Sequence, residues 1–335
     1  MNENGQKKGS ARDFSAAVVY YLLNILLFPV TLIGLVIWIG KLIFSGSKSG
    51  VSTTAQGPLS ARWTEHNLGT RSDEPANRLM RVLPGVPFTG VYVASWPMFW
   101  AHKLTGFVPK TFRYPFEGEV SPQDEASARI AFFDNVVDRT LTEIRQFVIL
   151  GAGFDTRAFR LPKGTQVRSF EIDTPKTQTV KRERLEKVGI DLTGVTFVPA
   201  DFEKEDWLAR LVEAGFDPGK PALFLWEGVT MYLDRKTIED TLRKVAGTAR
   251  GSVIAFDFFT TEALESQEFY WRFARASTKA VGEPLKFGVD STPPSSERLA
   301  ELLQSCGLSL GEHRTLGKET EGKRAWGGFA TAIVK

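Results

Sequence analysis

A glycine turn and a series of acidic residues in the second half of the chain are the groups best suited to chemistry. Gly151 and Gly153 lie in the segment LGAGFD, directly after the apolar run QFVIL. Neither has a Cβ, so the backbone there can turn sharply and approach a bound molecule closely. No Gly-Lys-Ser/Thr follows and the third glycine of the dinucleotide fingerprint is missing, so neither a P-loop nor a complete pyrophosphate-binding turn is indicated. The turn alone is typical both of a ligand site and of a tight strand-to-helix bend.

The next three strand-like runs each end in an acid. SFEID ends at Asp173 with Glu171 two residues earlier, VPADFE carries Asp201 beside Phe202, and LFLWEG ends close to Glu227. Ligands of open α/β sheets bind beyond the carboxyl ends of the strands, so these acids are expected at one rim. Asp173 follows the glycine turn by about 20 residues, which suits hydrogen bonds to the hydroxyls of a ribose. NAD sites and S-adenosylmethionine sites share this feature, and Asp201 alone could equally be a helix N-cap.

Alternating strands and helices position these residues. The predicted strands cover 146–150, 167–173, 195–201, 222–228 and 252–258, and the helices between them lie near 175–188, 203–214 and 234–249. This alternation predicts an α/β fold, a Rossmann-like doubly wound and mostly parallel sheet with helices on both faces. A helix is also predicted from Ser121, with Pro122 in its first turn. The terminal RAWGGFATAIVK is predicted to be a last, antiparallel strand at the sheet edge or just inside it.

Several segments between residues 120 and 260 together resemble one known family, the leucine carboxyl methyltransferases. They are ASARIAFFDNVV, VILGAGFDTRAFRL, FEIDTPKTQTVKRERL, VPADF and LFLWEGVTMYL, in this order. Many bacterial members of that family are S-adenosylmethionine-dependent O-methyltransferases. The combination of GAGxDTRxxRL, FEIDxP and EGxxMYL is specific, whereas each motif alone is less so. The resemblance implies a class I methyltransferase fold with S-adenosylmethionine as the cofactor.

The resemblance also implies roles for individual residues around that cofactor. Arg129 would pair with the methionine carboxylate, which a guanidinium can bind bidentately. Gly151 and Gly153 would contact the methionine portion, and Glu227 would lie near the methionine end or the sulfonium. Asp173 would bind the ribose hydroxyls, with Glu171 in support. Asp201 and Phe202 would contact the adenine. Asp155 and Arg157 would mainly hold the turn. The family has a cofactor-binding lysine upstream of the arginine, and this sequence offers no clear counterpart in 59–118.

Methyl transfer from a sulfonium is an in-line displacement, so an enzyme can act largely by orienting the acceptor. A carboxylate acceptor needs no deprotonation at neutral pH, whereas a hydroxyl acceptor calls for a base. Tyr232 and Glu227 are the candidate catalytic residues on the presumed acceptor side, and a structural or cofactor-supporting role is the alternative for both. In the family's archetype the acceptor is a protein carboxyl terminus, whereas bacterial relatives are usually assigned to small molecules.

The amino-terminal part predicts a membrane anchor. Residues 14–40 contain no charged residue. This stretch is long enough to span a bilayer as a helix, with a kink at Pro29. The predicted organisation is a tail over 1–13, a transmembrane helix over 14–44, a flexible linker over 45–58, a helical or irregular cap or lid over 59–118 and the methyltransferase domain over 119–335. A signal peptide and a buried core helix are the alternatives for the anchor. The uncharged segment 86–101, interrupted by Pro97, predicts membrane contact, a lid or plain core.

The charge and the cysteine and histidine content limit the classes of ligand and partner to be expected. The net charge of +3 gives no case for nucleic-acid binding, and one cysteine with three scattered histidines predicts no metal site. With an anchor, the expected acceptor is a small-molecule or lipid-like compound, hydrophobic or membrane-associated. The catalytic domain is expected on the cytoplasmic side, because S-adenosylmethionine is made in the cytosol. An NAD(P)-dependent oxidoreductase and a non-catalytic membrane-tethered binding module are the alternative functions, and oligomeric state is not predicted.

Overall fold

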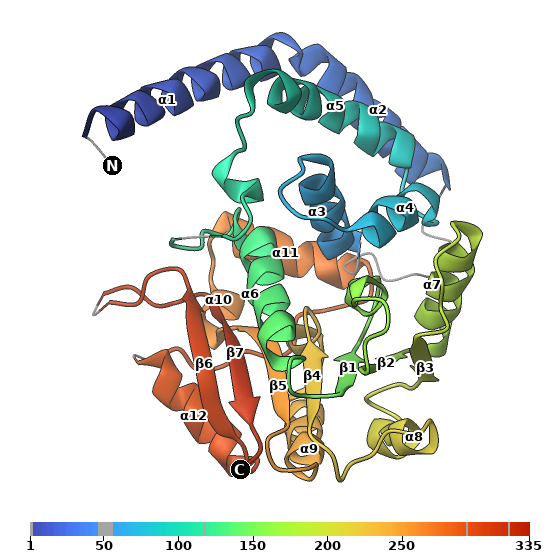
Figure 1. Ribbon diagram of the computed structural model, residues 1–335. Helices are drawn as coiled ribbons and strands as arrows, with labels where there is room; N and C mark the ends of the chain where they lie inside the picture. Colours follow the sequence, from blue (N-terminus) through green and yellow to red (C-terminus); the bar gives the residue numbers. More distant parts are fainter. Residues whose placement is uncertain (1–2, 46–55, 117, 293, 321) are drawn as a thin grey trace.

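The computed structural model describes residues 3–45, 56–116, 118–292, 294–320 and 322–335. Figure 1 shows a sheet with helices packed on it and an arch of long helices above the sheet. The strands are β1 (Gln146–Leu150), β2 (Arg168–Asp173), β3 (Val195–Pro199), β4 (Ala222–Trp226), β5 (Val253–Phe259), β6 (Ser309–Leu316) and β7 (Gly327–Ile333). Their order in the sheet is β3-β2-β1-β4-β5-β7-β6. The first five are parallel, and β7 runs antiparallel to β5 and to β6.

Apolar residues cover both faces of this sheet. The helices that pack on it or join its strands are α6 (Glu125–Thr140), α7 (Pro175–Lys187), α8 (Trp207–Glu213), α9 (Arg235–Ala246), α10 (Thr261–Glu265), α11 (Phe269–Ala280) and α12 (Ser295–Ser305). One core contains residues of α8, α9 and α12, such as Leu242, together with Val148. The other contains α6 residues such as Phe133 together with Phe147. Successive β1 residues thus pack into opposite cores. This explains why the central strands are continuous apolar runs in the sequence.

The predicted α/β class, the mostly parallel sheet and the antiparallel last strand are confirmed. β7 lies just inside the edge, and β6 is an edge strand that the sequence pattern did not reveal. The helix predicted from Ser121 begins only at Glu125. The Ser121 hydroxyl instead donates to Asp124 Oδ2 at 2.7 Å, within a turn that precedes the helix.

The cap region, predicted to be helical or irregular, is mostly helical. It contains α3 (Gln56–Asn67), α4 (Glu74–Val82), α5 (Phe88–Thr105) and the short η1 (Lys110–Phe112). Residues of α3 and α4, including Trp63 and Leu79, form a third apolar core with Phe154 of the domain below. α5 continues through Pro97, so this proline does not interrupt the segment as the sequence suggested. Most of the predicted linker over 45–58 lies outside the described residues, and 56–58 form the first turn of α3.

The amino-terminal segment is not the one helix predicted over 14–44. It forms α1 (Glu3–Leu26) and α2 (Phe28–Ser45), and α1 includes most of the predicted tail. The stretches Asp13–Leu26 and Phe28–Lys41 meet at an angle of 56°. Pro29 explains the break, because it has no N–H to donate and its ring would clash with the carbonyl of Ile25. Within the described residues, no single helix has the length and apolarity of a membrane span. Taken together, the two stretches on either side of the bend, which we call the bent pair, have both.

Candidate active site

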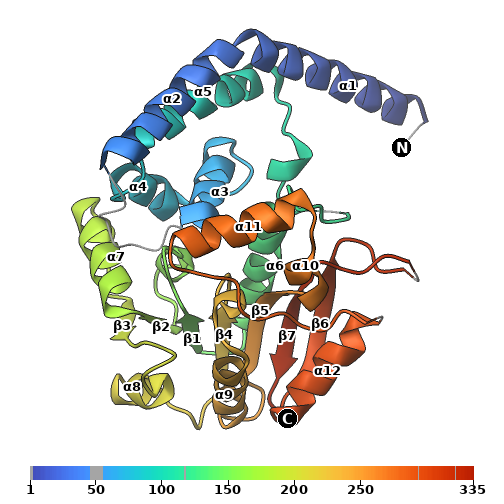
Figure 2. The same cartoon turned by 180° about the vertical axis from the view of Figure 1, so that it is seen from behind.

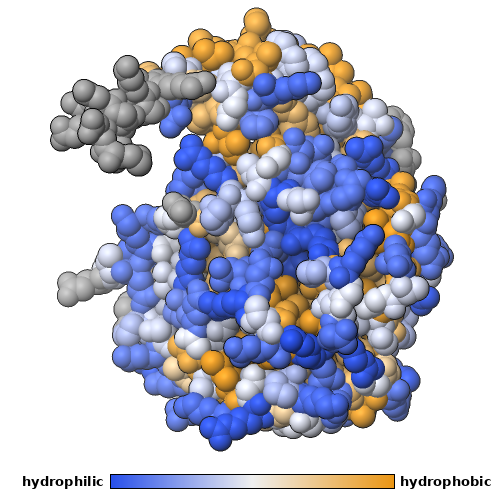
Figure 3. Space-filling view, in the orientation of Figure 1, coloured by the Kyte–Doolittle hydropathy of each residue, from blue (hydrophilic) through white to orange (hydrophobic). Residues whose placement is uncertain are grey.

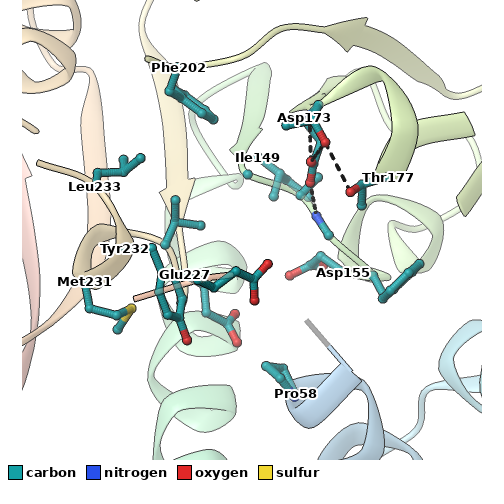
Figure 4. A pocket seen from close by; sticks show the side chains of 18 of the residues that line it. Pro58, Ile149, Asp155, Asp173, Thr177, Phe202, Glu227, Met231, Tyr232 and Leu233 are labelled. Atoms are coloured by element: carbon teal, nitrogen blue, oxygen red, sulfur yellow. Dashed lines mark hydrogen bonds between the residues drawn. The ribbon is translucent and has the colours of Figure 1, made fainter. Parts of the chain in front are cut away.

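A cavity of about 460 Å³ lies at the carboxyl ends of β1, β2 and β4. The strand order reverses between β1 and β4, which is the switch point where open α/β sheets bind ligands. Figure 4 shows side chains from the strand ends on one side of this cavity and Pro58 of α3 on the other. α3 therefore covers one side of the cavity. Its volume falls within the usual range for small-molecule sites, about 300–1,000 Å³.

The glycine turn and Asp173 form one wall. Gly151 has a φ of 66°, and a Cβ there would lie 2.5 Å from Val229 Cγ2, so no other residue fits without movement. Gly153 also has a positive φ, and its N–H donates to Asp173 Oδ2 at 2.6 Å (Figure 4). Thr174 N donates to the other carboxylate oxygen, also at 2.6 Å. Burial raises the pKa of Asp173, while these backbone donors oppose the change. The turn and the acid of the second strand thus hold each other in place.

Glu171 occupies a different environment from Asp173. It is fully buried and does not belong to the cavity wall in the part of the chain that the structure describes. Its Oε2 accepts from Lys181 Nζ of α7 at 2.6 Å. Burial raises the pKa of Glu171 to about 7, and the neighbouring Lys181 only partly offsets that effect. Its support for the site is therefore indirect, through the packing of α7 against β2.

Asp201 and Phe202 line the cavity just beyond β3, as predicted. Asp201 accepts from Lys204 Nζ at 2.7 Å and from Glu203 N at 3.0 Å. The Phe202 ring packs on Trp207 with ring centroids 6.1 Å apart. The arrangement puts an acid and an apolar ring side by side at the rim, next to the ribose-binding candidate Asp173.

Four buried charges form the arginine–acid cluster: Arg62, Asp155, Arg157 and Glu227. Arg62, Asp155 and Glu227 line a second wall of the cavity, and Arg157 pairs with both of these acids. Arg62 Nη2 donates to Asp155 Oδ2 at 2.9 Å and lies 3.1 Å from Glu227 Oε2. Arg157 donates to the same two carboxylates, and its backbone N–H donates to Asp155 Oδ1 at 2.7 Å. In Figure 4 the Glu227 and Asp155 carboxylates point toward one another. Because two guanidinium groups donate to Glu227, its geometry suits charge balance better than proton abstraction.

Arg62 is the functional candidate that sequence reasoning missed. It lies on α3, far before the motifs, and it lines the cavity while being almost fully buried. Its place on the apolar face of α3, between Leu59 and Trp63, gave no signal in the sequence, since isolated arginines are usually solvated. It is a cation upstream of Arg129, although an arginine rather than the lysine of the family pattern.

Arg129, predicted to pair with the methionine carboxylate, lines the cavity from α6. Its Nε lies 3.1 Å from Asp257 Oδ2, and its guanidinium also pairs with Glu125. Burial raises the pKa of Asp257 to about 6, with Arg129 acting in the opposite direction. Asp257 was not among the predicted residues, and it fixes the Arg129 side chain from β5.

Tyr232 and the loop after α11 complete the lining. Tyr232 ends η3 (Thr230–Tyr232) and lines the cavity with Met231 and Leu233 (Figure 4). The loop contributes residues 282–284 and Lys286, whose backbone N–H donates to Met231 O at 2.7 Å. This loop lies beyond the recognised motifs, so the sequence did not assign it to the site.

A doubly wound sheet of this order, with a glycine turn and strand-end acids around one cavity, is the arrangement of a class I methyltransferase. A family model described as leucine carboxyl methyltransferase matches residues 118–246. A Mycobacterium tuberculosis (strain H37Ra) protein named "Putative S-adenosyl-L-methionine-dependent methyltransferase" is 31% identical over 267 residues, which cover 75% of this chain and 80% of that protein. The chain belongs to this family of S-adenosylmethionine-dependent methyltransferases, and S-adenosylmethionine is its cofactor.

Other relatives are similar over shorter stretches. A Mycolicibacterium smegmatis protein of the same name is 41% identical over 178 residues, covering 51% of this chain and 53% of that protein, so the chain matches about half of this relative. Among solved structures, magnesium protoporphyrin IX methyltransferase from Synechocystis has a TM-score of 0.42 at 11% identity, covering 65% of this chain and 90% of that one. An O-methyltransferase family protein from Burkholderia thailandensis has a TM-score of 0.40 at 16% identity, with 63% and 60% covered.

The oxidoreductase alternative is not favoured. Such an enzyme would carry a tyrosine and a lysine one helical turn apart, and the sequence has Tyr232 and Lys236 at that spacing. Tyr232 lies in η3, outside α9, so the two residues do not share a helix.

Proposed function

We propose that the protein transfers a methyl group to a carboxylate or hydroxyl oxygen of a hydrophobic, membrane-associated acceptor. S-adenosylmethionine, when bound, supplies a methyl group already activated on its sulfonium. The observation that carries the proposal is the convergence of Arg129, Asp173, Asp201 and Glu227 on one cavity, beside the two glycines of the turn. Acids, apolar contacts and a buried cation are the groups that a nucleoside bearing an amino acid requires.

The residues fit that cofactor in a specific order. Asp173 would accept hydrogen bonds from the ribose hydroxyls, and Asp201 with Phe202 would contact the adenine. The close approach at Gly151 and Gly153 would admit the methionine portion. Arg129 would bind the methionine carboxylate, with Arg62 as a second cation. Because Asp257 and Glu227 already orient these two guanidinium groups, little side-chain freedom would be lost on binding.

The acceptor side is mainly apolar, which supports a hydrophobic acceptor. Met231, Leu233 and Phe259 line it, and Tyr232 is a polar group among them. A carboxylate acceptor would need only orientation against the methyl group. A hydroxyl acceptor would need a proton to leave, and Tyr232 is the residue we assign to positioning or receiving it.

The membrane assignment belongs to the same proposal. The amino-terminal helices would hold the protein at a membrane, with the catalytic domain on the cytoplasmic side, where S-adenosylmethionine is made. Support comes from the uncharged residues 14–40 and from the combined length and apolarity of the bent pair. A small-molecule or lipid-like acceptor dissolved in that membrane would then be available to the site.

The test is methyl transfer from radiolabelled S-adenosylmethionine to lipid extracts and, in parallel, to soluble carboxylic acids and phenols. Methyl esters release their label in mild base and methyl ethers do not, so the product identifies the acceptor oxygen. For a hydroxyl acceptor, Tyr232→Phe should lower kcat by about 10²-fold with cofactor affinity unchanged. For a carboxylate acceptor, kcat should change little. Label that enters soluble acceptors only would refute the membrane-associated acceptor, and no transfer by cofactor-binding protein would refute the activity.

A further inference from the structure

We propose that α1, α2 and α5 together form a membrane-binding layer that enters one leaflet of a bilayer without crossing it. We call this set of helices the insertion layer, and its uncharged parts are residues 14–40 and 88–101. This proposal rests on the membrane association proposed above. It adds α5 to the membrane-binding helices and places all three helices in the plane of the membrane. The bilayer surface is the partner, with lipid chains against the apolar faces and anionic headgroups against the ends.

The outer side of the insertion layer is an unusually large exposed apolar surface. Isolated exposed apolar residues are ordinary, but contiguous ones mark an interaction surface. The large apolar side chains of this layer that are more than a third exposed are Phe14, Val18, Val19, Tyr21, Leu22, Ile25, Leu26, Phe28, Leu32, Ile33, Leu35, Val36, Ile39, Tyr92, Trp96, Trp100 and Leu104. In Figure 3 apolar residues gather at the top of the molecule, where Figure 1 places this layer.

Close backbone packing makes α5 part of the layer. Both cartoon views show α5 running along α2 (Figures 1 and 2). A Cβ on Gly90 would lie 2.6 Å from Trp38 N, and Gly34 meets the Ala94 backbone in the same way. The Thr31 hydroxyl donates to Ala94 O at 3.2 Å. Contacts through small residues are how helices pack where no water surrounds them. To cross a bilayer with α1, α2 would have to leave this contact.

Charge and aromatic residues favour lipid over a protein partner. From residue 14 to 64 the chain has no acid and has the cations Lys41 and Lys48, besides Arg62, which is buried in the arginine–acid cluster. From 82 to 116 it again has no acid but carries Lys103, Lys110 and Arg113. Cations flanking an uncharged surface match an anionic leaflet. A protein interface would instead have a mixed polar rim.

The exposed side of α5 carries the aromatic residues expected at headgroup level. Tyr92, Trp96 and Trp100 follow one another at four-residue spacing, and the two tryptophan rings stack with centroids 5.9 Å apart. Tyrosine and tryptophan concentrate at membrane–water interfaces because one end of each is apolar and the other polar. A helix lying in the plane of the interface presents such a row to a single depth.

This placement connects the membrane with the cavity. The insertion layer lies above α3 and α4, on the side of the sheet where the strands end (Figures 1 and 2). The cavity lies at those same strand ends, beneath α3. A bound leaflet would therefore lie on the cavity side of the molecule rather than behind the sheet, close to where an apolar acceptor is needed.

Flotation with vesicles of phosphatidylcholine and phosphatidylglycerol tests the surface. The full chain should float with the vesicles, and more so at low salt. The triple variant Leu32→Glu/Val36→Glu/Ile39→Glu, on one exposed face of α2, should lose at least about tenfold of its partition. Val212→Glu on α8, an exposed apolar residue outside the layer, is the control and should float normally. Absence of flotation, or a triple variant that floats like the control, would overturn the inference.

Cysteine labelling separates in-plane insertion from a span. Cys306 is buried, so a Cys306→Ala background can carry one new cysteine at a time. Ser10→Cys and Ser277→Cys place it before the uncharged residues 14–40 and on α11 of the catalytic domain. In inverted inner-membrane vesicles of a bacterial expression host, an impermeant maleimide should label both positions. Labelling of Ser277→Cys alone, with Ser10→Cys reactive only in spheroplasts, would show a span and contradict the inference.

Titration of S-adenosylmethionine into the same proteins keeps the two proposals apart. The α2 variants should bind the cofactor like the parent protein. Loss of flotation with intact cofactor binding would bear on the membrane layer alone. Flotation without cofactor binding would count against the proposed enzyme and leave the layer standing.

Discussion

At the scale of single residues, acids on one strand can serve different purposes. Asp173 and Glu171 are two positions apart on β2, yet only Asp173 reaches the cavity. Glu171 lies with Lys181 in a buried pair, where Glu171 Oε1 has no hydrogen-bond partner among the described residues. Removing a charge from water is costly even when it is paired. We therefore expect Glu171 to affect stability more than cofactor binding.

The pH dependence of stability tests this assignment. Burial raises the folded-state pKa of Glu171 to about 7 from its ordinary value of 4.5. Between these two pH values the unfolded chain releases the proton and the folded chain keeps it. The contribution of Glu171 to the free energy of unfolding is therefore fully present below pH 4.5 and is lost as the pH rises through about 7. Raising the pH from about 5 to about 8 should lower the free energy of unfolding of the parent protein by about 2–3 kcal/mol more than that of Glu171→Gln.

Chemical unfolding at the two pH values makes the comparison. Glu186→Gln, also a glutamate-to-glutamine change, is the control, because Glu186 is a solvent-exposed residue of α7. This control should show the same pH dependence as the parent. Parallel pH dependence of the parent and Glu171→Gln would mean that Glu171 is ionised throughout, stabilised by Lys181.

At the scale of elements, the sequence predicted what depends on local pattern. Strands β1 to β5 were apparent because buried parallel strands are short, continuous apolar runs. β6 was missed because its sequence SLGEHRTL is polar, as an edge strand with a solvated side permits. The individual helices of the cap could not be placed from the sequence, because the proline and glycine content of 59–118 also suggested irregular structure.

For the site, too, the sequence predicted only those residues whose place follows from local pattern. Residues at strand ends could be assigned, since sheet geometry brings them to one rim. Arg62, Asp257 and the loop over 282–286 reach the cavity or its lining residues through tertiary packing, which no local spacing encodes.

A pair of glycines tests the packing of the insertion layer. A side chain at Gly90 would collide with the backbone at Trp38, whereas a Cβ at Gly40 meets nothing within 4 Å. We expect Gly90→Leu to separate α5 from α2, with faster proteolysis of the amino-terminal segment and a melting temperature several degrees lower. Gly40→Leu, the same change on α2, should behave like the parent. Equal behaviour of the two variants would show that the helices do not pack closely.

At the scale of the whole molecule, buried charges join the cap to the catalytic domain. Asp134 of α6 accepts from Arg71 Nε and Arg157 Nε, both at 2.6 Å. Arg71 lies between α3 and α4, and it also donates to Asp73, the N-cap residue of α4. The network continues through Arg157 into the arginine–acid cluster of the cavity. Cap and cofactor site are therefore parts of one electrostatic unit.

Neutralising the centre of this network should be costly. Asp134→Asn leaves two buried guanidinium groups undercompensated, so we expect a loss of about 3–5 kcal/mol in the free energy of unfolding. Asp138→Asn, one turn further along α6 at an exposed position, removes the same charge and should cost under about 1 kcal/mol. Urea unfolding measures both values. Similar losses in the two variants would argue against the network as the link between cap and domain.

The cofactor site itself is tested most directly by isothermal titration of S-adenosylmethionine into the full chain in detergent. The parent protein and Asp191→Ala, which removes an exposed acid in the loop before β3, should bind the cofactor equally. Asp173→Ala should weaken binding by at least about tenfold, since the carboxylate proposed to accept from the two ribose hydroxyls is lost. Unchanged binding in folded Asp173→Ala, or no binding by the folded parent, would contradict the account.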